Sequence, residues 1–521
     1  MVALGMVAAA LLGLLYLVFE PSSADLAAQA FRSDLFSAHG FLIWNDYWYG
    51  GHYLPGYSVL FPPLGAALGP RLVGATSAVA AAGLFGLLAR QRFGSEAGLA
   101  TLWFGVATAS LLIAGQLTFA LGVAIGLGAL LALQRGRLAV AVVLAVITAC
   151  ASPVAGLFLA LAGIAVALTG RRRAGIVVAA GALVPIVALA LAFPTEGYFP
   201  FVATAFLPVP LLAAAALILL PAEERTLRIG VVLYAGLCVV LAIVHTPVGA
   251  NAARLGSLFG GPVLALGLAG RRPVALALLA VPFLYWQWAA PVRDLANAAG
   301  DPSVDQAYYA PLLAELQRRT GGAPVRVEIP PTQNRWEADY VAPRFPLARG
   351  WLRQLESDDF DLFTGGHLTP AAYRTWLYDN GVAYVALPDA DPDYLAEDED
   401  ALIRGGLPYL RRVWANRHWG LYAVRGTPGL VSPANHASGA PGPSARLAAV
   451  GPASFTLSSR RAGAFLVRIH YTRYWAVAAG NACVERDGAW TRVDVRDAGT
   501  VSVAARFSIG ALLGRDRECS G

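Results

Sequence analysis

Residues 97–134, AGLATLWFGVATASLLIAGQLTFALGVAIGLGALLALQ, contain no charged side chain. A Gly115-Gln116 turn divides this stretch into two apolar segments. Each is close to the roughly 20 residues that a helix needs to cross a bilayer. We therefore predict two membrane-spanning helices, at 97–114 and 117–134.

Comparable apolar runs, separated by Arg clusters or by Pro and Gly turns, fill the first 290 residues. They predict further spans at 2–19, 72–89, 138–151, 153–169, 174–193, 202–221, 229–245, 255–269 and 273–290. Two of these, 138–151 and 153–169, are short and meet at Ser152-Pro153, which leaves a re-entrant pair open. The fold class that follows is an α-helical, multi-pass membrane protein with about 11 transmembrane helices.

The composition of the whole chain agrees with this class. Of its 521 residues, 57% are hydrophobic and 14% are charged, against roughly 25% charged in ordinary soluble proteins. All 39 basic residues are Arg, and 14 of them lie in residues 1–290 beside only 8 acidic residues. The net charge of +6 therefore belongs to the apolar part, and the polar part carries no basic patch for a nucleic acid.

The distribution of Arg among the short loops predicts the orientation of the chain, because Arg-rich loops stay cytoplasmic. With the N-terminus inside, the cytoplasmic loops carry eleven Arg, against Arg32, Arg71 and Arg254 on the other side. The first apolar segment lacks a basic region before it and a clear cleavage site, so we treat it as a retained helix. We expect a plasma (inner) membrane protein with everything after residue 290 outside the cytoplasm.

From residue 291 the composition becomes that of an extracytoplasmic, water-exposed domain. Residues 291–426 predict an α/β domain with an amphipathic helix at 305–320 and strands at 325–330 and 382–387. A Pro/Gly/Ser/Ala-rich stretch at 427–446 predicts a linker. Residues 447–521 predict a β-sandwich-like module with strands at 453–458, 464–471 and 499–508. In that compartment Cys483 and Cys519 could form a disulfide.

The loop at 20–71 is too long and too aromatic to be a simple connector. Its first part predicts an interfacial helix with Asp25, Gln29 and Arg32 on one face, at i, i+4 and i+7. Its second part supplies rings and polar groups of the kind that grip sugars or a lipid head group, although an aromatic belt at the membrane surface explains them equally. These residues are Trp44, Asn45, Asp46, Tyr47, Trp48, Tyr49, His52, Tyr53 and Tyr57.

A second group of candidates lies in residues 245–261, at the outer ends of the ninth and tenth predicted spans. Arg254 could pair with a phosphate, since a guanidinium makes fork-shaped contacts with an oxyanion, and His245 and Asn251 could add donors. Arg254 could instead extend to lipid head groups. Gln116 is a polar position in an apolar helix that would face the same outer cavity or serve helix packing.

The N-in topology, the long first outer loop with an acidic residue just after the first helix, and the outer C-terminal domain resemble the GT-C class of membrane glycosyltransferases. Within it, four stretches resemble actinobacterial multi-pass proteins, some labelled 6-pyruvoyl-tetrahydropterin-synthase-related. These are WNDYWYGGHYLPGYSVLFPP (44–63), GQLTFALG (115–122), HTPVGANAARL (245–255) and RRVWANRHWGLYAV (411–424). The resemblance implies a polyprenyl-phosphate-linked sugar as donor, an envelope glycan or glycolipid as acceptor, and membrane lipid and envelope-biosynthesis proteins as partners.

In that class an acidic residue of the first outer loop acts as general base on the acceptor hydroxyl, and the lipid phosphate is the leaving group. The matching residue here is Asp25, with Asp34 and Asp46 as alternatives. A carboxylate suits this role if burial raises its pKa towards the working pH. The chain lacks the Asp-Asp or Asp-x-Asp pair that many members carry in this loop.

The polar part offers weaker candidates. Residues 332–368 hold Arg335, Trp336, Glu337 and Arg349, and we expect a solvated charged face with Trp anchors rather than a carbohydrate-contacting surface. The acidic stretch 389–400 lacks the spacing of a calcium loop, so we expect a solvated turn. The chain has no Cys/His metal signature, phosphate loop or dinucleotide motif. A divalent cation is left open as the only cofactor besides the sugar donor.

Three functions remain after this reading. The first is an inverting glycosyltransferase with Asp25 as base, Arg254 at the phosphate and the segment from Trp44 to Tyr57 as a wall of the site. The second is a transporter or flippase for a lipid-linked substrate, although no inverted repeat is evident. The third is a non-catalytic relative that scaffolds envelope enzymes.

Overall fold

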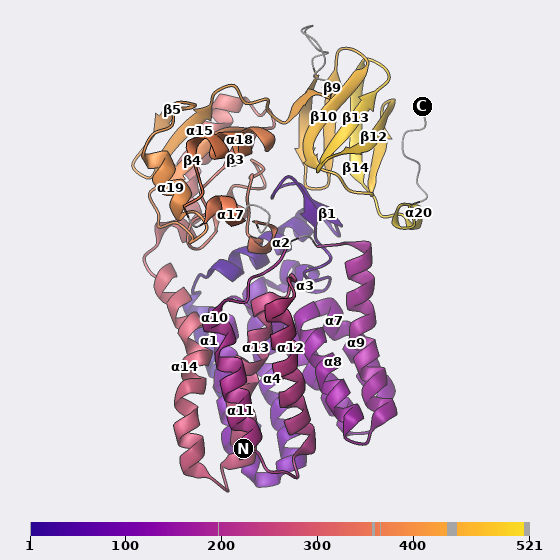
Figure 1. Cartoon of the computed structure of the whole chain (residues 1–521), viewed down its shortest axis with the longest axis vertical. Helices are drawn as coiled ribbons and strands as arrows, with labels where there is room; N and C mark the ends of the chain where they lie inside the picture. The colour runs from indigo at the N-terminus through magenta and orange to yellow at the C-terminus, as the bar shows by residue number, and fades with distance from the viewer. Residues whose placement is uncertain (1, 196, 357–359, 365, 435–444, 515–521) are drawn as a thin grey trace. The chain divides into compact units, whose positions relative to one another are not determined.

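The computed structural model describes residues 2–195, 197–356, 360–364, 366–434 and 445–514 (Figure 1). The chain forms two compact units. The helical unit comprises residues 1–40 and 55–299, and the polar unit comprises residues 41–54 and 300–521. The first long loop is thus divided between the two units, and the polar unit begins after residue 299 because the last long helix continues to Ala298.

The helical unit is built almost entirely from apolar helices. Their bounds are α1 Val2–Phe19, α2 Ala24–His39, α3 Phe61–Leu68, α4 Pro70–Phe93, α5 Gly98–Ile113, α6 Leu117–Gln134, α7 Leu138–Ala151, α8 Pro153–Leu168, α9 Arg172–Ala192, α10 Ala203–Phe206, α11 Pro208–Leu219, α12 Arg225–Ile243, α13 Ala253–Leu268 and α14 Pro273–Ala298, with 3₁₀ turns η1 Gly94–Ala97 and η2 Gly249–Ala252. Each apolar segment predicted from the sequence contains a helix, and 202–221 is divided between α10 and α11.

Local sequence explains where these helices begin and end. The α4 helix ends at Gly94, which has φ +61°, after two Arg side chains in its last turn that favour the negative helix C-terminus. Ser152 ends α7 and begins α8, and its Oγ accepts a hydrogen bond from the backbone N–H of Ala155 at 3.4 Å.

Apolar helices of this length support a membrane protein. Among the described residues, five helical stretches are long and apolar enough to cross a bilayer, or six if α1 and α2, bent by 77°, count as one broken span. One of the five, Pro70–Ile113, contains both α4 and α5, which pack against each other. The predicted count of about 11 spans is therefore not confirmed, because helices such as α7 and α8 are shorter than a full crossing.

The polar unit contains a four-stranded sheet with strand order β3-β4-β6-β5. Its strands are β3 Arg326–Glu328, β4 Val382–Pro388, β5 Leu410–Ala415 and β6 Trp419–Val424, and β3 is parallel to β4 while the other pairs are antiparallel. The helices of this part are α15 Gln306–Thr320, α16 Glu337–Tyr340, α17 Phe360–Phe363, α18 Pro370–Asp379 and α19 Glu397–Arg404, with 3₁₀ turns η3 Pro302–Val304 and η4 Arg353–Glu356. The predicted helix at 305–320 and strands at 325–330 and 382–387 are confirmed.

The C-terminal part is a β-sandwich of two four-stranded sheets, with orders β12-β13-β10-β7 and β11-β14-β9-β8 (Figure 1). The strands are β7 Val431–Pro433, β8 Ala445–Gly451, β9 Ser454–Ser459, β10 Gly463–His470, β11 Trp475–Ala479, β12 Ala482–Asp487, β13 Trp490–Val495 and β14 Gly499–Ala505, followed by the single helical turn α20 Ile509–Leu512. Alternate residues such as Phe455, Leu457 and Val503 fill its core.

The predicted linker at 427–446 is in part a strand, since β7 pairs with β10. Residues 435–444 of that linker lie outside the described residues. The predicted disulfide partner Cys519 also lies outside them.

Candidate functional site

The α2 helix carries the predicted polar face. Gln29 and Arg32 are buried in the helical unit rather than solvated. The Nε2 of Gln29 donates to the Tyr57 hydroxyl at 2.8 Å, and the Arg32 guanidinium lies 3.9 Å from the centre of the Tyr57 ring. Tyr57, an aromatic residue of the predicted wall, thus joins this face in the helical unit.

Asp25, in the first turn of α2, forms an ion pair with Arg254 in the first turn of α13. The distance from Oδ2 of Asp25 to Nη2 of Arg254 is 3.5 Å, and about a fifth of each side chain is exposed. The two residues are more than two hundred positions apart in the sequence. The structure therefore joins the predicted base and the predicted phosphate ligand in one partly buried pair.

The turn between α5 and α6 packs directly against the start of α2. Gly115 has φ +72°, and a Cβ built on it would lie 2.5 Å from both the backbone nitrogen of Leu26 and the Oγ of Ser23. Only a glycine permits both this backbone conformation and this close approach. The GQLTFALG motif thus fixes the position of the α2 N-terminus, and with it Asp25.

We expect Gly115→Ala to destabilise the helical unit by about 1–3 kcal/mol more than Gly136→Ala. Gly136 is a matched control because it has φ +76° and no atom within 4 Å of a built Cβ, so it shares only the backbone cost. Thermal unfolding of both variants in detergent measures the difference. If both variants lost the same stability, the turn at Gly115 would adjust to the added methyl group and would not position α2.

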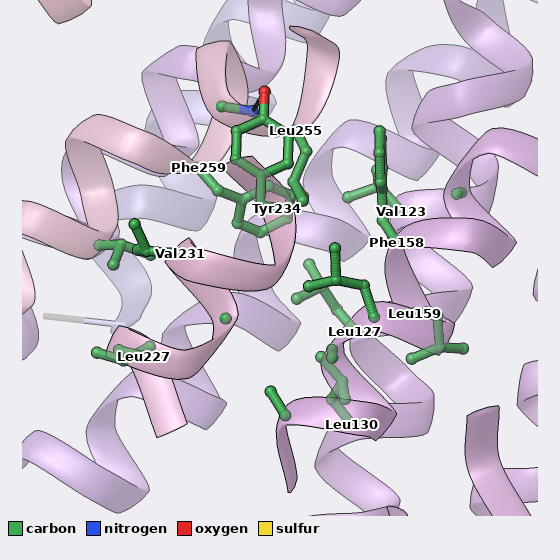
Figure 2. A pocket seen from close by; sticks show the side chains of 18 of the residues that line it. Val123, Leu127, Leu130, Phe158, Leu159, Leu227, Val231, Tyr234, Leu255 and Phe259 are labelled. Carbon is green, nitrogen blue, oxygen red and sulfur yellow. Dashed lines mark hydrogen bonds between the residues drawn. The ribbon is translucent and has the colours of Figure 1, made fainter. Parts of the chain in front are cut away.

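An apolar cavity of about 360 Å³ lies between α6, α8, α12 and α13. Figure 2 shows Tyr234, Leu255 and Phe259 on one side of it and Val123 and Phe158 on the other. The hydroxyl of Tyr234 is already bonded, since it donates to the Ala252 carbonyl and accepts from the Gly256 N–H. The lining therefore presents almost only carbon and suits a hydrocarbon chain.

Aromatic contacts connect this cavity to the ion pair. Phe158 lines the cavity and meets the Phe119 ring edge to face, with centroids 5.9 Å apart. The Arg254 guanidinium lies 5.9 Å from the centre of the same Phe119 ring. Leu255, the residue after Arg254, also lines the cavity. A charged pair and an apolar cavity are thus adjacent, a relation that the sequence did not reveal because the lining residues look like ordinary helix core.

The remaining candidates of the helical unit are more scattered. Asp34 is exposed on α2. Gln116 is partly buried at the N-terminus of α6, next to Gly115. His245 is exposed and stacks on Tyr198, with ring centroids 4.3 Å apart. Asn251 lies in η2, directly before α13. Asn251 therefore lies just before Arg254 in the sequence, and Gln116 follows Gly115, which packs on the start of α2. No contact among those described brings His245 to the pair.

The other aromatic candidates fold into the polar unit, in which residues 44–53 form a small hairpin of β1 Trp44–Asn45 and β2 His52–Tyr53. Trp48 is fully buried, stacks on His52, and donates from Nε1 to the Ala338 carbonyl at 2.9 Å. The Tyr53 hydroxyl bonds to Oγ1 of Thr472 at 2.8 Å. These contacts are with both the α/β part and the sandwich, so the segment joins the two parts of the polar unit.

The position of Asp46 differs from that of a solvated base. It is buried with Asn45 in the hairpin, and its Oδ1 accepts a hydrogen bond from Trp44 Nε1 at 2.6 Å. Burial raises the pKa of Asp46 well above its usual value, although Trp44 and Arg326 oppose this. The backbone N–H of Asp46 donates to Pro452 of the sandwich at 2.6 Å. In this structure Asp46 contributes to the packing of the polar unit.

The expected solvated face at 332–368 is wrong. Arg335 and Arg349 are buried, because each is surrounded by carboxylates. Arg335 contacts Glu356 at 2.6 Å and Asp393 at 2.9 Å, and Arg349 pairs with Glu328 at 2.7 Å. Charge in the sequence predicted exposure, but paired charges can be buried when each finds its partners.

The cofactor and family comparisons add no further assignment. Among the described residues, no group of three or more His, Cys, Asp or Glu side chains could hold a metal ion. The expected solvated turn at 389–400 is wrong in part, because Asp393 and Glu399 are buried in ion pairs with Arg335 and Arg349. A scan against models of protein families and a search of curated proteins both find no match for this chain. The site therefore rests on its own geometry.

Proposed function

We propose that the protein is an inverting membrane glycosyltransferase of the GT-C type, which moves a sugar from a polyprenyl-phosphate donor to an envelope glycan or lipid. The observation that carries this proposal is the Asp25–Arg254 ion pair beside the apolar cavity. A lipid-linked sugar phosphate needs an apolar surface for its chain, a cation for its phosphate and a base near its sugar. The cavity, Arg254 and Asp25 support the proposal because all three belong to the helical unit.

In the proposed reaction, the prenyl chain lies along the cavity lined by Phe158 and Leu255, and its phosphate binds Arg254. The guanidinium then exchanges the Asp25 carboxylate for phosphate oxygens, with which it makes bidentate contacts. The released Asp25 accepts the proton of the acceptor hydroxyl. The hydroxyl oxygen forms a bond to the anomeric carbon, the bond from that carbon to the phosphate oxygen breaks, and the lipid phosphate leaves with the electron pair. Direct displacement inverts the anomeric centre.

The proposal includes the orientation inferred from the Arg distribution and about 11 crossings. The polar unit would then lie outside the cytoplasm, on the side where lipid-linked sugars serve as donors. Since residues 44–53 are packed inside the polar unit, we assign them to its architecture and not to the wall of the site.

A deletion strain tests the proposal directly. Mass spectrometry of its envelope glycans and polyprenyl-phosphate sugars should show a truncated glycan and an accumulated donor, and the wild-type gene should restore both. The missing sugar identifies the donor. Unchanged profiles would exclude the transferase function. A lipid-linked sugar that accumulates on the cytoplasmic side would instead support a flippase.

The phosphate role of Arg254 predicts a specific kinetic defect. Arg254→Gln should raise the donor concentration for half-maximal rate about 10- to 100-fold, because a charged hydrogen-bond partner contributes about 1.5–3 kcal/mol. Initial rates of the purified protein against donor concentration measure this. Arg71→Gln is the control, since Arg71 bonds to the carbonyl oxygens of Glu20 and Pro21. An unchanged donor dependence in Arg254→Gln would contradict the assignment.

A further inference from the structure

The last described turn of the polar unit exposes a compact group of large apolar side chains. Phe507 is 51% exposed, Ile509 is 67% exposed and Leu513 is 57% exposed. Among the described residues of the polar unit, the other large apolar side chains with such exposure are Phe41 and Tyr394, which are remote from this turn in the sequence. We call Phe507, Ile509 and Leu513 the apolar tip.

The apolar tip is ordered by contacts with the rest of the polar unit. Ser508 caps α20, since its Oγ accepts a hydrogen bond from the Ala511 N–H at 2.9 Å, and Ala511 is buried. Because Ile509 and Leu513 are four residues apart, they lie on one face of this turn. The Phe507 ring packs on Tyr474, with centroids 5.5 Å apart. The fold thus positions three apolar side chains towards solvent, which marks an interaction surface.

Basic groups border the tip. Arg506 and Arg473 are both exposed, and Arg473 Nη1 donates to the Leu512 carbonyl at 3.4 Å, which fixes it at the end of α20. Residues 506–514, RFSIGALLG, contain no acidic side chain. Apolar side chains beside Arg are the combination that inserts into the boundary of an anionic bilayer.

The path of the chain joins the polar unit to a unit that is apolar enough to lie in a membrane. The chain passes between the two units at residues 40/41, 54/55 and 299/300, and each crossing is a short segment between one helix or strand and the next. The polar unit is therefore tethered to a unit made of apolar helices. We propose that the apolar tip inserts into the head-group region of an anionic membrane, with Arg473 and Arg506 at the lipid phosphates.

Photo-crosslinking in lipid nanodiscs tests this proposal on the full chain. A benzophenone amino acid replaces Ile509 in one sample and Tyr394, which is 53% exposed, in the control. In nanodiscs of phosphatidylglycerol we expect lipid adducts at position 509 several times more abundant than at position 394. The same replacement at Leu513 provides a second probe, should the variant at 509 fold poorly.

The charge requirement is tested in the same samples. Arg473→Gln with Arg506→Gln should lower the adduct yield at position 509 by up to about 30-fold in phosphatidylglycerol and leave it unchanged in phosphatidylcholine, because each Arg near an anionic surface contributes about 1 kcal/mol. Equal lipid adducts at 509 and 394 would overturn the proposal. Adducts to a second protein chain in place of lipid would overturn it as well, and would assign the tip to a protein interface.

Discussion

Arg335→Met is expected to destabilise the polar unit by about 3–5 kcal/mol, the range measured when one partner of a buried ion pair is removed. The Arg335 side chain is fully buried, and Nη1 donates to Glu356 at 2.6 Å and to the Gly350 carbonyl at 2.7 Å. Methionine fills a similar volume, so the expected loss comes from charge and not from a cavity.

The size of this effect follows from what remains after the substitution. Glu356 and Asp393 would stay buried, with one cationic partner removed from each. Although burial opposes it, the guanidinium groups of Arg335 and Arg353 hold the pKa of Asp393 below its usual range. The stabilisation linked to this lowered pKa is present at neutral pH and is lost as the pH falls through the folded value. Arg335→Met should therefore also weaken this acid dependence.

Amide hydrogen exchange of the full chain in detergent can measure the loss, because it reports the opening of the polar unit separately from that of the helices. Arg404→Met is the matched control, since Arg404 forms an exposed i,i+4 pair with Asp400 and should contribute less than about 0.5 kcal/mol. Equal protection in the two variants would contradict a stabilising role for the buried network. Glu356→Gln combined with Arg335→Met should recover part of the loss.

Contacts between residues far apart in the sequence explain why the polar unit was harder to predict than the helical unit. Long apolar runs indicate helices such as α6 from a short window of sequence, and alternation indicates strands such as β9 in the same way. The burial of Trp48 depends on Ala338, which lies 290 residues away in the chain. A hydrogen bond of that kind leaves no local pattern, so the aromatic segment alone could not predict that Trp48 is buried in the polar unit.

In the candidate site, local sequence identified the charged residues but not the cavity beside them. Asp25 and Arg254 were each selected from local sequence, and the structure brings them together. The sequence did not predict a contact between them. It placed both at helix ends on one side of the membrane, which is compatible with their proximity. The cavity was missed because Leu255 and Phe158 resemble any other apolar helix residues, and only the packing of four helices creates the space between them.

Asp25→Asn is expected to reduce the turnover of the proposed transfer about 10²- to 10⁴-fold, the usual contribution of a positioned general base. Asparagine keeps the shape of the side chain but cannot accept a proton from the acceptor hydroxyl. It also removes the charge that competes with the lipid phosphate for Arg254, so the donor concentration for half-maximal rate should stay the same or fall. This pattern is the reverse of that expected for Arg254→Gln.

Initial rates of purified Asp25→Asn against donor concentration distinguish a base from a merely structural carboxylate. Asp34→Asn is the matched control, because Asp34 is an exposed carboxylate on the same helix and should retain nearly full turnover. If Asp25 only anchored Arg254, its loss would weaken donor binding and leave turnover within about tenfold, which would exclude it as the base. A large loss of turnover with unimpaired donor binding requires that Asp25 acts after the lipid phosphate has displaced it from Arg254, and the ion pair is then the resting state of the site.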